Sequence, residues 1–210
     1  MIRIMIADDH PIFREGVKKF LGSEIDFSVT VEAENSAEAI EKIMNEDFDI
    51  LLLDIGLPGR SGIDILPEVK RLKPNLPVLI YSMHPEERYA IRALKAGASG
   101  YLSKEEDADK LIEALRTIHS GRKYITPSLA EKLAFEIAEP THSVLHETLS
   151  NREFEVMQKI ALGKSIKEIA DALSLSVNTV NTYRARILEK MQMKNNMDIA
   201  RYAIKSNLID

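Results

Sequence analysis

The sequence contains no cysteine. Disulfide bonds, thiol nucleophiles and cysteine-ligated zinc sites are therefore excluded. No run of apolar residues approaches the roughly 18 that are needed to cross a bilayer. The first nine residues also lack the charged, apolar and small-residue regions of a signal peptide. We therefore expect a cytoplasmic protein that does not enter a membrane.

The composition is that of an ordinary soluble, globular protein, with 45% hydrophobic and 29% charged residues in a chain of 210. This length suits two domains. Charge is distributed unevenly, since residues 1–121 carry 15 lysines and arginines against 22 aspartates and glutamates, whereas residues 122–210 carry 13 against 11. Only the second, mildly basic part is suited to lie along nucleic-acid phosphates.

The first 121 residues alternate short apolar runs with helical patterns. The runs are nearly continuous, which is typical of strands buried on both faces of a parallel sheet. We predict an α/β fold, a doubly wound five-stranded parallel sheet of the flavodoxin-like kind. The expected strands are 2–7, 29–33, 49–53, 77–81 and 100–103, and the expected helices are 11–21, 36–45 with Ser36 as N-cap, 64–73, 86–96 and 107–120.

The remaining residues indicate a small all-α domain. We predict domain boundaries that give residues 1–121 to the α/β domain, 122–147 to a helix and linker, and 148–210 to a helical domain. The helix before the linker is expected at 127–137. The domain itself is expected to contain helices at 151–162, 165–173, 177–191 and 196–206.

Polar residues follow four of the five predicted strands. Asp8 and Asp9 come after the first strand, Asp54 after the third, Ser82 after the fourth and Lys104 after the fifth. The carboxyl ends of parallel strands lie at one edge of the sheet, so these side chains should converge. Three carboxylates together need a counter-charge, and Mg²⁺ is the usual intracellular divalent ion with oxygen ligands. A carboxylate beside a metal, a lysine and a hydroxyl is suited to attack a phosphoryl group.

Each of these residues alone would carry little information, because an aspartate after a strand is most often a turn former or helix cap. The joint pattern is what indicates a site. His10 follows the acidic pair and could suggest a further ligand, but its place before Pro11 favours a simple role at the start of the helix.

Two segments, 54–62 (DIGLPGRSG) and 96–104 (AGASGYLSK), resemble the receiver domain of bacterial two-component response regulators. The resemblance implies that Asp54 accepts a phosphoryl group from a sensor histidine kinase or a small phosphodonor. It implies a Mg²⁺ ion held by Asp9, Asp54 and the Gly56 carbonyl, with Asp8 acting through water. It further implies that Ser82 and Lys104 bind phosphoryl oxygens. Tyr101 would report the state through its rotamer, or would simply be a half-buried packing residue.

Residues 166–180 have the spacing of a helix-turn-helix, with small Ala170 allowing close approach and Leu173, Leu175 and Val180 packing the corner. The second helix should bury Val180, Ile187, Leu188 and Met191. Its other face is polar and suited to the major groove and its phosphates. The candidate DNA-binding residues are Asn178, Thr179, Asn181, Thr182, Arg184, Arg186 and Lys190.

The segments 149–153, 163–170 and 178–180 resemble the LuxR-type helix-turn-helix. Together the two resemblances cover nearly the whole chain, in the order found in response regulators of the NarL/FixJ class. They imply transcription control by sequence-specific binding to double-stranded DNA, with phosphorylation-dependent homodimers. Asn181 and Ala185 stand where relatives often carry lysines, so base contacts are not transferred to those two positions.

Two alternatives belong to other classes. An enzyme that binds nucleotides would need a glycine-rich loop after the first strand, which residues 8–11 do not provide. Gly163-Lys164-Ser165 mimics the end of a phosphate-binding loop but no strand precedes it. A haloacid-dehalogenase-like phosphatase would place its aspartate after the first strand. We therefore expect no enzyme. The other alternative is a helical domain that binds a protein partner, and salt-dependent duplex binding would distinguish it from a DNA-binding domain.

Overall fold

The computed structural model describes residues 1–138, 145–206 and 208–209. The chain divides into two compact units, Met1–Ala138 and Glu139–Asp210. The domain boundaries drawn from the sequence stay a prediction, and the expected linker falls largely on residues 139–144, outside the described residues.

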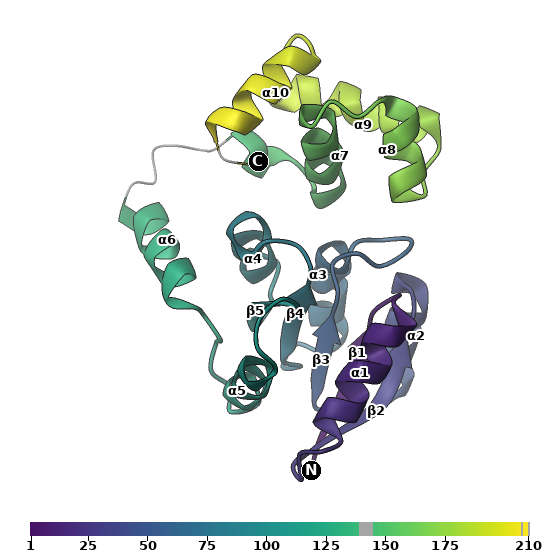
Figure 1. The fold of residues 1–210 in the computed structure, drawn as a ribbon, viewed down its shortest axis with the longest axis vertical. Helices are drawn as coiled ribbons and strands as arrows, with labels where there is room; N and C mark the ends of the chain where they lie inside the picture. The colour runs from purple at the N-terminus through teal and green to yellow at the C-terminus, as the bar shows by residue number, and fades with distance from the viewer. Residues whose placement is uncertain (139–144, 207, 210) are drawn as a thin grey trace. The chain divides into compact units, whose positions relative to one another are not determined.

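The first unit is built on the predicted five-stranded parallel sheet, whose strands lie in the order β2-β1-β3-β4-β5 (Figure 1). The strands are β1 (Ile2–Ala7), β2 (Phe27–Ala33), β3 (Ile50–Leu53), β4 (Val78–Ser82) and β5 (Gly100–Ser103). The helices are α1 (Pro11–Leu21), α2 (Ser36–Asn45), α3 (Gly62–Leu72), α4 (Glu86–Lys95), α5 (Ala108–His119) and α6 (Pro127–Ala138).

Successive strand residues point to opposite faces of the sheet, and both faces are covered. On one face, strand residues such as Ile4, Ile6 and Leu52 form a core with Val17 of α1 and Leu115 of α5. The opposite face is covered by α2, α3 and α4, which pack in that order. Helix α6 packs against α4 within the same unit. The doubly wound α/β fold is therefore confirmed.

The start of α2 differs from the prediction. Asn35, not Ser36, is the N-cap, and its side chain accepts a hydrogen bond from the Glu38 backbone N–H at 2.9 Å. The Ser36 hydroxyl is occupied elsewhere, since it donates to the Pro58 carbonyl at 3.1 Å and accepts from the Arg60 N–H at 2.9 Å. The predicted N-cap residue therefore fixes the loop between β3 and α3.

The second unit is helical, as predicted. It contains a 3-10 turn, η1 (Leu145–Thr148), followed by α7 (Asn151–Ala161), α8 (Ile166–Leu173), α9 (Val177–Lys190) and α10 (Asn196–Lys205). Within this unit α7 packs against both α10 and α9 (Figure 1). Within the described residues, no helix has the length and apolar character that spanning a membrane requires.

Local sequence signals define the helix-turn-helix. Ser150 with Glu153 and Ser165 with Glu168 form capping boxes at the starts of α7 and α8. Helix α8 ends at Ser174, whose left-handed backbone (φ 53°) turns the chain toward α9. Ser176 caps α9 by accepting a hydrogen bond from the Thr179 N–H. These signals end α8 and begin α9, so that the two helices are joined by a short turn.

Candidate functional site

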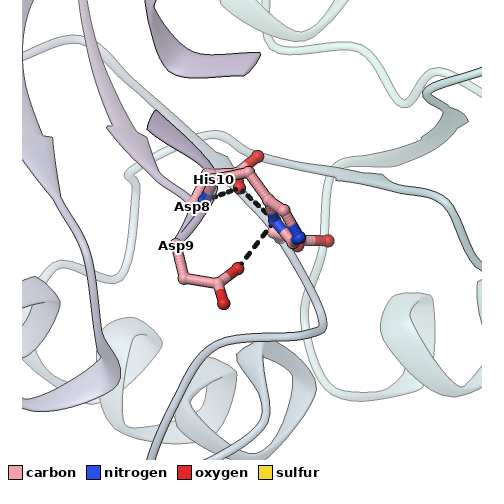
Figure 2. Close-up of side chains that lie close together, drawn as sticks. Asp8, Asp9 and His10 are labelled. Carbon is pink, nitrogen blue, oxygen red and sulfur yellow. Dashed lines mark hydrogen bonds and ion pairs between the residues drawn. The ribbon is translucent and has the colours of Figure 1, made fainter. Parts of the chain in front are cut away.

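The carboxylates expected at the sheet edge do come together. Ala7 pairs with Leu53 at the ends of β1 and β3, and the Asp54 N–H donates to the Ala7 carbonyl at 2.9 Å. Asp8 and Asp54 therefore emerge from neighbouring strands. One potential ligand atom from each of Asp8, Asp9, His10 and Asp54 lies within 4.8 Å of the others. Figure 2 shows the first three of these side chains turned toward one another.

Lys104 supplies a positive charge to this cluster. Its Nζ lies 2.6 Å from Asp8 Oδ2 and 3.2 Å from Asp54 Oδ2, and its side chain is only 3% exposed. The ammonium also lies 4.2 Å from the centre of the Phe13 ring, a cation–π contact from α1. One lysine thus bridges two buried carboxylates across the carboxyl ends of β1, β3 and β5.

The cluster has the donor set that a divalent cation requires. Asp54 is 5% exposed, and no described residue makes a hydrogen bond to its Oδ1. A buried carboxylate oxygen left without a partner is costly, so such an atom is expected to meet a cation or water. Asp8 and Asp9 add further carboxylate oxygens, which hard divalent ions prefer. The acidic cluster could therefore hold a metal ion.

Two glycines shape the loop beside Asp54. A Cβ at Gly56 would lie 3.3 Å from Asp54 Oδ2, so a side chain there would crowd the carboxylate. A Cβ at Gly62 would lie 2.0 Å from the Asp54 carbonyl oxygen, which excludes any other residue in this turn. The turn at Gly62 therefore requires a residue without a side chain, and Gly56 leaves more room beside the carboxylate.

Ser82 and Tyr101 lie on β4 and β5, as predicted. Ser82 is buried at the end of β4, beside β3, and its Oγ accepts a hydrogen bond of 3.5 Å from the His84 N–H. Tyr101 is fully buried, and its hydroxyl donates to the His84 carbonyl at 2.7 Å. Burial, together with the nearby Tyr89 hydroxyl and Asp54, raises the pKa of the Tyr101 phenol far above its usual range. The hydroxyl therefore stays a hydrogen-bond donor.

One residue of this site was missed in the sequence. Arg14 of α1 is 6% exposed, donates to the Asp8 carbonyl at 2.6 Å, and pairs with Glu34 and, at 3.4 Å, with Glu32. Its guanidinium thereby holds the backbone of the β1–α1 turn. The sequence did indicate that Arg14 faces inward. It lies three positions before Val17, and residues three apart on a helix share a face.

The outward face of α9 carries most of the candidate DNA-binding residues. Asn178, Asn181, Thr182 and Arg186 are exposed. A hollow of about 350 Å³ on this face is lined by Asn178, Thr179, Thr182, Tyr183 and Arg186. Tyr183 was not among the predicted residues, although it follows Thr182 directly in the sequence. The inward positions Val180, Ile187 and Met191 are buried as predicted, whereas Leu188 is half-buried.

Two of the predicted cations, Arg184 and Lys190, have side-chain partners within the helical unit. Arg184 Nε donates to Asn196 Oδ1 at 2.6 Å, which ties α9 to the start of α10. Lys190 Nζ lies 2.6 Å from Glu153 Oε2, and that glutamate side chain is 3% exposed. These two cations therefore take part in the packing of the unit, while Arg186 is turned toward solvent.

Comparison with known proteins identifies both parts of the chain. Residues 4–116 match the family model described as "Response regulator receiver domain", and residues 147–203 match "Bacterial regulatory proteins, luxR family". The chain is 34% identical to the oxygen regulatory protein NreC of Staphylococcus carnosus (strain TM300), with all of both chains covered.

Solved structures show the same similarity. RcsB from Salmonella enterica serovar Typhimurium, bound to promoter rprA in the presence of phosphomimetic BeF3⁻, is 25% identical with a TM-score of 0.63, covering 96% of this chain and 97% of RcsB. A structure of two RcsB dimers bound to two parallel DNAs is 26% identical with a TM-score of 0.60, at the same coverage. The chain belongs to the two-component response regulators of the NarL/FixJ class, in which a receiver domain precedes a LuxR-type DNA-binding domain.

Proposed function

We propose that Asp54 is the phosphoacceptor and that its phosphorylation controls DNA binding through α9. The observation that carries this proposal is the arrangement around Asp54. Lys104 contacts one of its carboxylate oxygens, while the other is buried and without a hydrogen-bond partner among the described residues. A buried carboxylate with one oxygen uncommitted, beside a fixed cation, is suited to act as a nucleophile toward phosphorus.

The proposed reaction is a direct phosphoryl transfer. A carboxylate oxygen of Asp54 attacks the phosphorus of a phosphohistidine on a sensor kinase, or of a small phosphodonor. The bond from phosphorus to the leaving atom breaks, and the electron pair leaves with the imidazole or other leaving group, which takes up a proton. Lys104 and the Ser82 hydroxyl then bind oxygens of the new acyl phosphate, which carries more negative charge than the carboxylate from which it forms.

The proposal includes a Mg²⁺ ion at this edge of the sheet, in keeping with a cytoplasmic chain. Asp9, Asp54 and the Gly56 carbonyl would hold it, and Asp8 would act through water. When bound, the ion neutralises charge on the transferring phosphoryl oxygens. The uncommitted Asp54 oxygen and the lack of a side chain at Gly56 support this assignment.

Tyr101 is the proposed switch. Its hydroxyl now donates to the His84 carbonyl, which follows Ser82 by two residues. Movement of Ser82 toward a phosphoryl group at Asp54 would therefore act on the same short loop that holds Tyr101. Phosphorylation would then favour one arrangement of this loop and of α4, as a shift between two populations.

DNA is the proposed output partner, with no catalytic turnover by the helical domain. The proposed contacts are Asn178, Thr179, Asn181, Thr182, Arg184, Arg186 and Lys190. The exposed, polar face of α9 supports a position in the major groove. RcsB, which is similar over nearly the whole chain, binds promoter DNA and is described as dimers on DNA. We propose a phosphorylation-dependent homodimer that reads two half-sites about one helical turn apart.

The direct test is incubation of the full chain with acetyl phosphate and Mg²⁺, with intact mass as the readout. Wild-type protein should gain one phosphoryl group, and Asp54→Asn should gain none. Asp47→Asn is the matched control, because Asp47 is an exposed carboxylate close by in the sequence and should leave incorporation unchanged. Equal incorporation in the wild type and Asp54→Asn would remove Asp54 as the acceptor.

A further inference from the structure

The imidazole of His10 lies against the carboxylates of the acidic cluster, although its place before Pro11 favoured a simple role at the start of the helix. His10 Nδ1 lies 3.2 Å from Asp8 Oδ1 and 2.8 Å from Asp9 Oδ1 (Figure 2). The ring makes no capping hydrogen bond to α1, and its side chain is 68% exposed. Capping therefore does not explain why the ring turns inward to the two aspartates.

His10 Nδ1 and Asp9 Oδ1 have the spacing of neighbouring ligands on one metal ion. Two ligands at right angles around an ion, each bonded at about 2.1 Å, lie about 3 Å apart. The measured separation of these two atoms is 2.8 Å. Asp8 is committed elsewhere, since its Oδ2 contacts Lys104 at 2.6 Å and its Oδ1 accepts the His10 backbone N–H at 2.9 Å, in keeping with its proposed role through water.

A simple hydrogen bond explains less of the arrangement than a shared cation does. A protonated Nδ1 could donate to Asp8 or Asp9, but Asp54 Oδ1 would still be buried without a partner among the described residues. A cation held by Asp9, His10 and Asp54 would meet that oxygen as well as the ring, and one ligand atom from each of these side chains lies within 4.8 Å of the others. The arrangement is therefore better accounted for by a metal ion.

We infer that His10 is a nitrogen ligand of this site and raises its preference for first-row transition ions over Mg²⁺. The inference rests on the proposed metal site and names one more ligand for it. Mg²⁺ favours oxygen ligands and keeps bound water, whereas imidazole favours ions such as Co²⁺, Ni²⁺ and Zn²⁺. His10 thus adds affinity for these transition ions and very little affinity for Mg²⁺.

The test uses the full chain without an affinity tag and titrates it separately with Mg²⁺ and Co²⁺ in a calorimeter. His10→Ala should weaken Co²⁺ binding about tenfold and change Mg²⁺ binding less than twofold, on the general scale for losing an interaction at a metal site. His119→Ala is the matched control, because His119 is an exposed histidine at the end of α5. That variant should bind both ions as the wild type does.

A spectroscopic readout separates ligation from a change in shape. With Mn²⁺ bound, pulsed paramagnetic resonance should detect a directly bonded ¹⁴N in the wild type and in His119→Ala, and none in His10→Ala. Absence of that nitrogen in the wild type, or equal Co²⁺ affinity in His10→Ala, overturns the inference and leaves the proposed metal site standing. Failure of wild-type protein to bind either ion overturns both.

Discussion

Lys104 Nζ lies 2.6 Å from Asp8 Oδ2, and both side chains are almost completely buried. The same ammonium reaches Asp54 Oδ2 at 3.2 Å, so one positive charge serves two carboxylates that would otherwise repel each other. Without a phosphoryl group on Asp54, the lysine neutralises part of the charge of both carboxylates and keeps them close to each other. In the proposed phosphorylated state the lysine would bind the phosphoryl group instead. Its partner would then change, while its place directly after β5 would stay the same.

Replacement of Lys104 by Met should therefore destabilise the receiver unit. Breaking a buried pair by removing one partner costs about 3 to 5 kcal/mol, and here two carboxylates lose their counter-charge. Added Mg²⁺ should restore part of the loss, because an ion that binds only the folded state stabilises it. Urea unfolding with and without Mg²⁺ measures both effects.

Lys19→Met provides the matched control for this experiment, since Lys19 is exposed on α1. It should change the unfolding free energy by less than about 1 kcal/mol, with no added response to Mg²⁺. Similar losses in the two variants would contradict a special role for the Lys104 charge.

Arg14 and Lys18 allow a second comparison on one helix. Arg14 is buried and joins the Asp8 carbonyl to Glu32 and Glu34, whereas Lys18 is 45% exposed and pairs with Glu32 at 2.7 Å. Arg14→Met should lower the unfolding free energy by about 1 to 3 kcal/mol, because it leaves the buried Asp8 carbonyl without its guanidinium donor. Lys18→Met should lower it by less than about 1 kcal/mol. Chemical denaturation of both variants checks the ranking, and a larger loss for Lys18→Met would reverse it.

Much of the candidate site could be predicted because its residues are fixed by strand ends. Apolar runs locate the strands, and a parallel sheet brings their carboxyl ends to one edge. Asp8, Asp54 and Lys104 follow from that rule alone, although they lie as far as 96 residues apart in the chain.

The features that were missed depend on side-chain partners from distant elements. Asn and Ser are both good N-caps, and only the Pro58 carbonyl, 22 residues away, decides that Ser36 is used elsewhere. Arg14 meets Glu32 and Glu34 across 18 and 20 residues. No local pattern contains such pairings. Lys190, which was predicted as a DNA-binding residue of α9, likewise lies against a distant partner, Glu153.

Arg186 and Lys190 should respond differently to substitution, although both were predicted to bind DNA. Arg186 is exposed on the outer face of α9, so Arg186→Ala should weaken duplex binding and reduce the dependence of log affinity on log salt by about one unit if it contacts a phosphate. Lys190→Ala should instead lower the stability of the helical unit by about 1 to 2 kcal/mol, by leaving the Glu153 carboxylate with fewer partners.

Fluorescence anisotropy of a labelled target duplex across a salt series, together with thermal unfolding, separates these effects. Loss of stability in Arg186→Ala without any change in binding would remove that residue from the interface. Duplex binding by the wild type that does not depend on salt would favour the other reading of the domain, as a module that binds a protein partner.

The pair of Glu153 and Lys190 also predicts how the helical unit responds to acid. Burial by itself raises the pKa of the Glu153 carboxyl, but hydrogen bonds from Lys190 and Ser150 outweigh it and hold the pKa below its usual range. A lowered pKa means that the unfolded chain binds the proton more readily. The stabilisation is therefore complete above the unfolded pKa of about 4.3, and it is lost as the pH falls through the folded value.

The test follows unfolding of the full chain between pH 6 and pH 3, with a signal from the helical unit. The unfolding free energy should fall as the pH falls, and this fall should be smaller in Glu153→Gln. The glutamine keeps an oxygen acceptor for the Ser150 N–H but carries no charge that titrates. Glu189→Gln is the matched control, because Glu189 is exposed on α9 next to Lys190. If Glu189→Gln reduces the acid sensitivity as much as Glu153→Gln does, the buried pair is not its source.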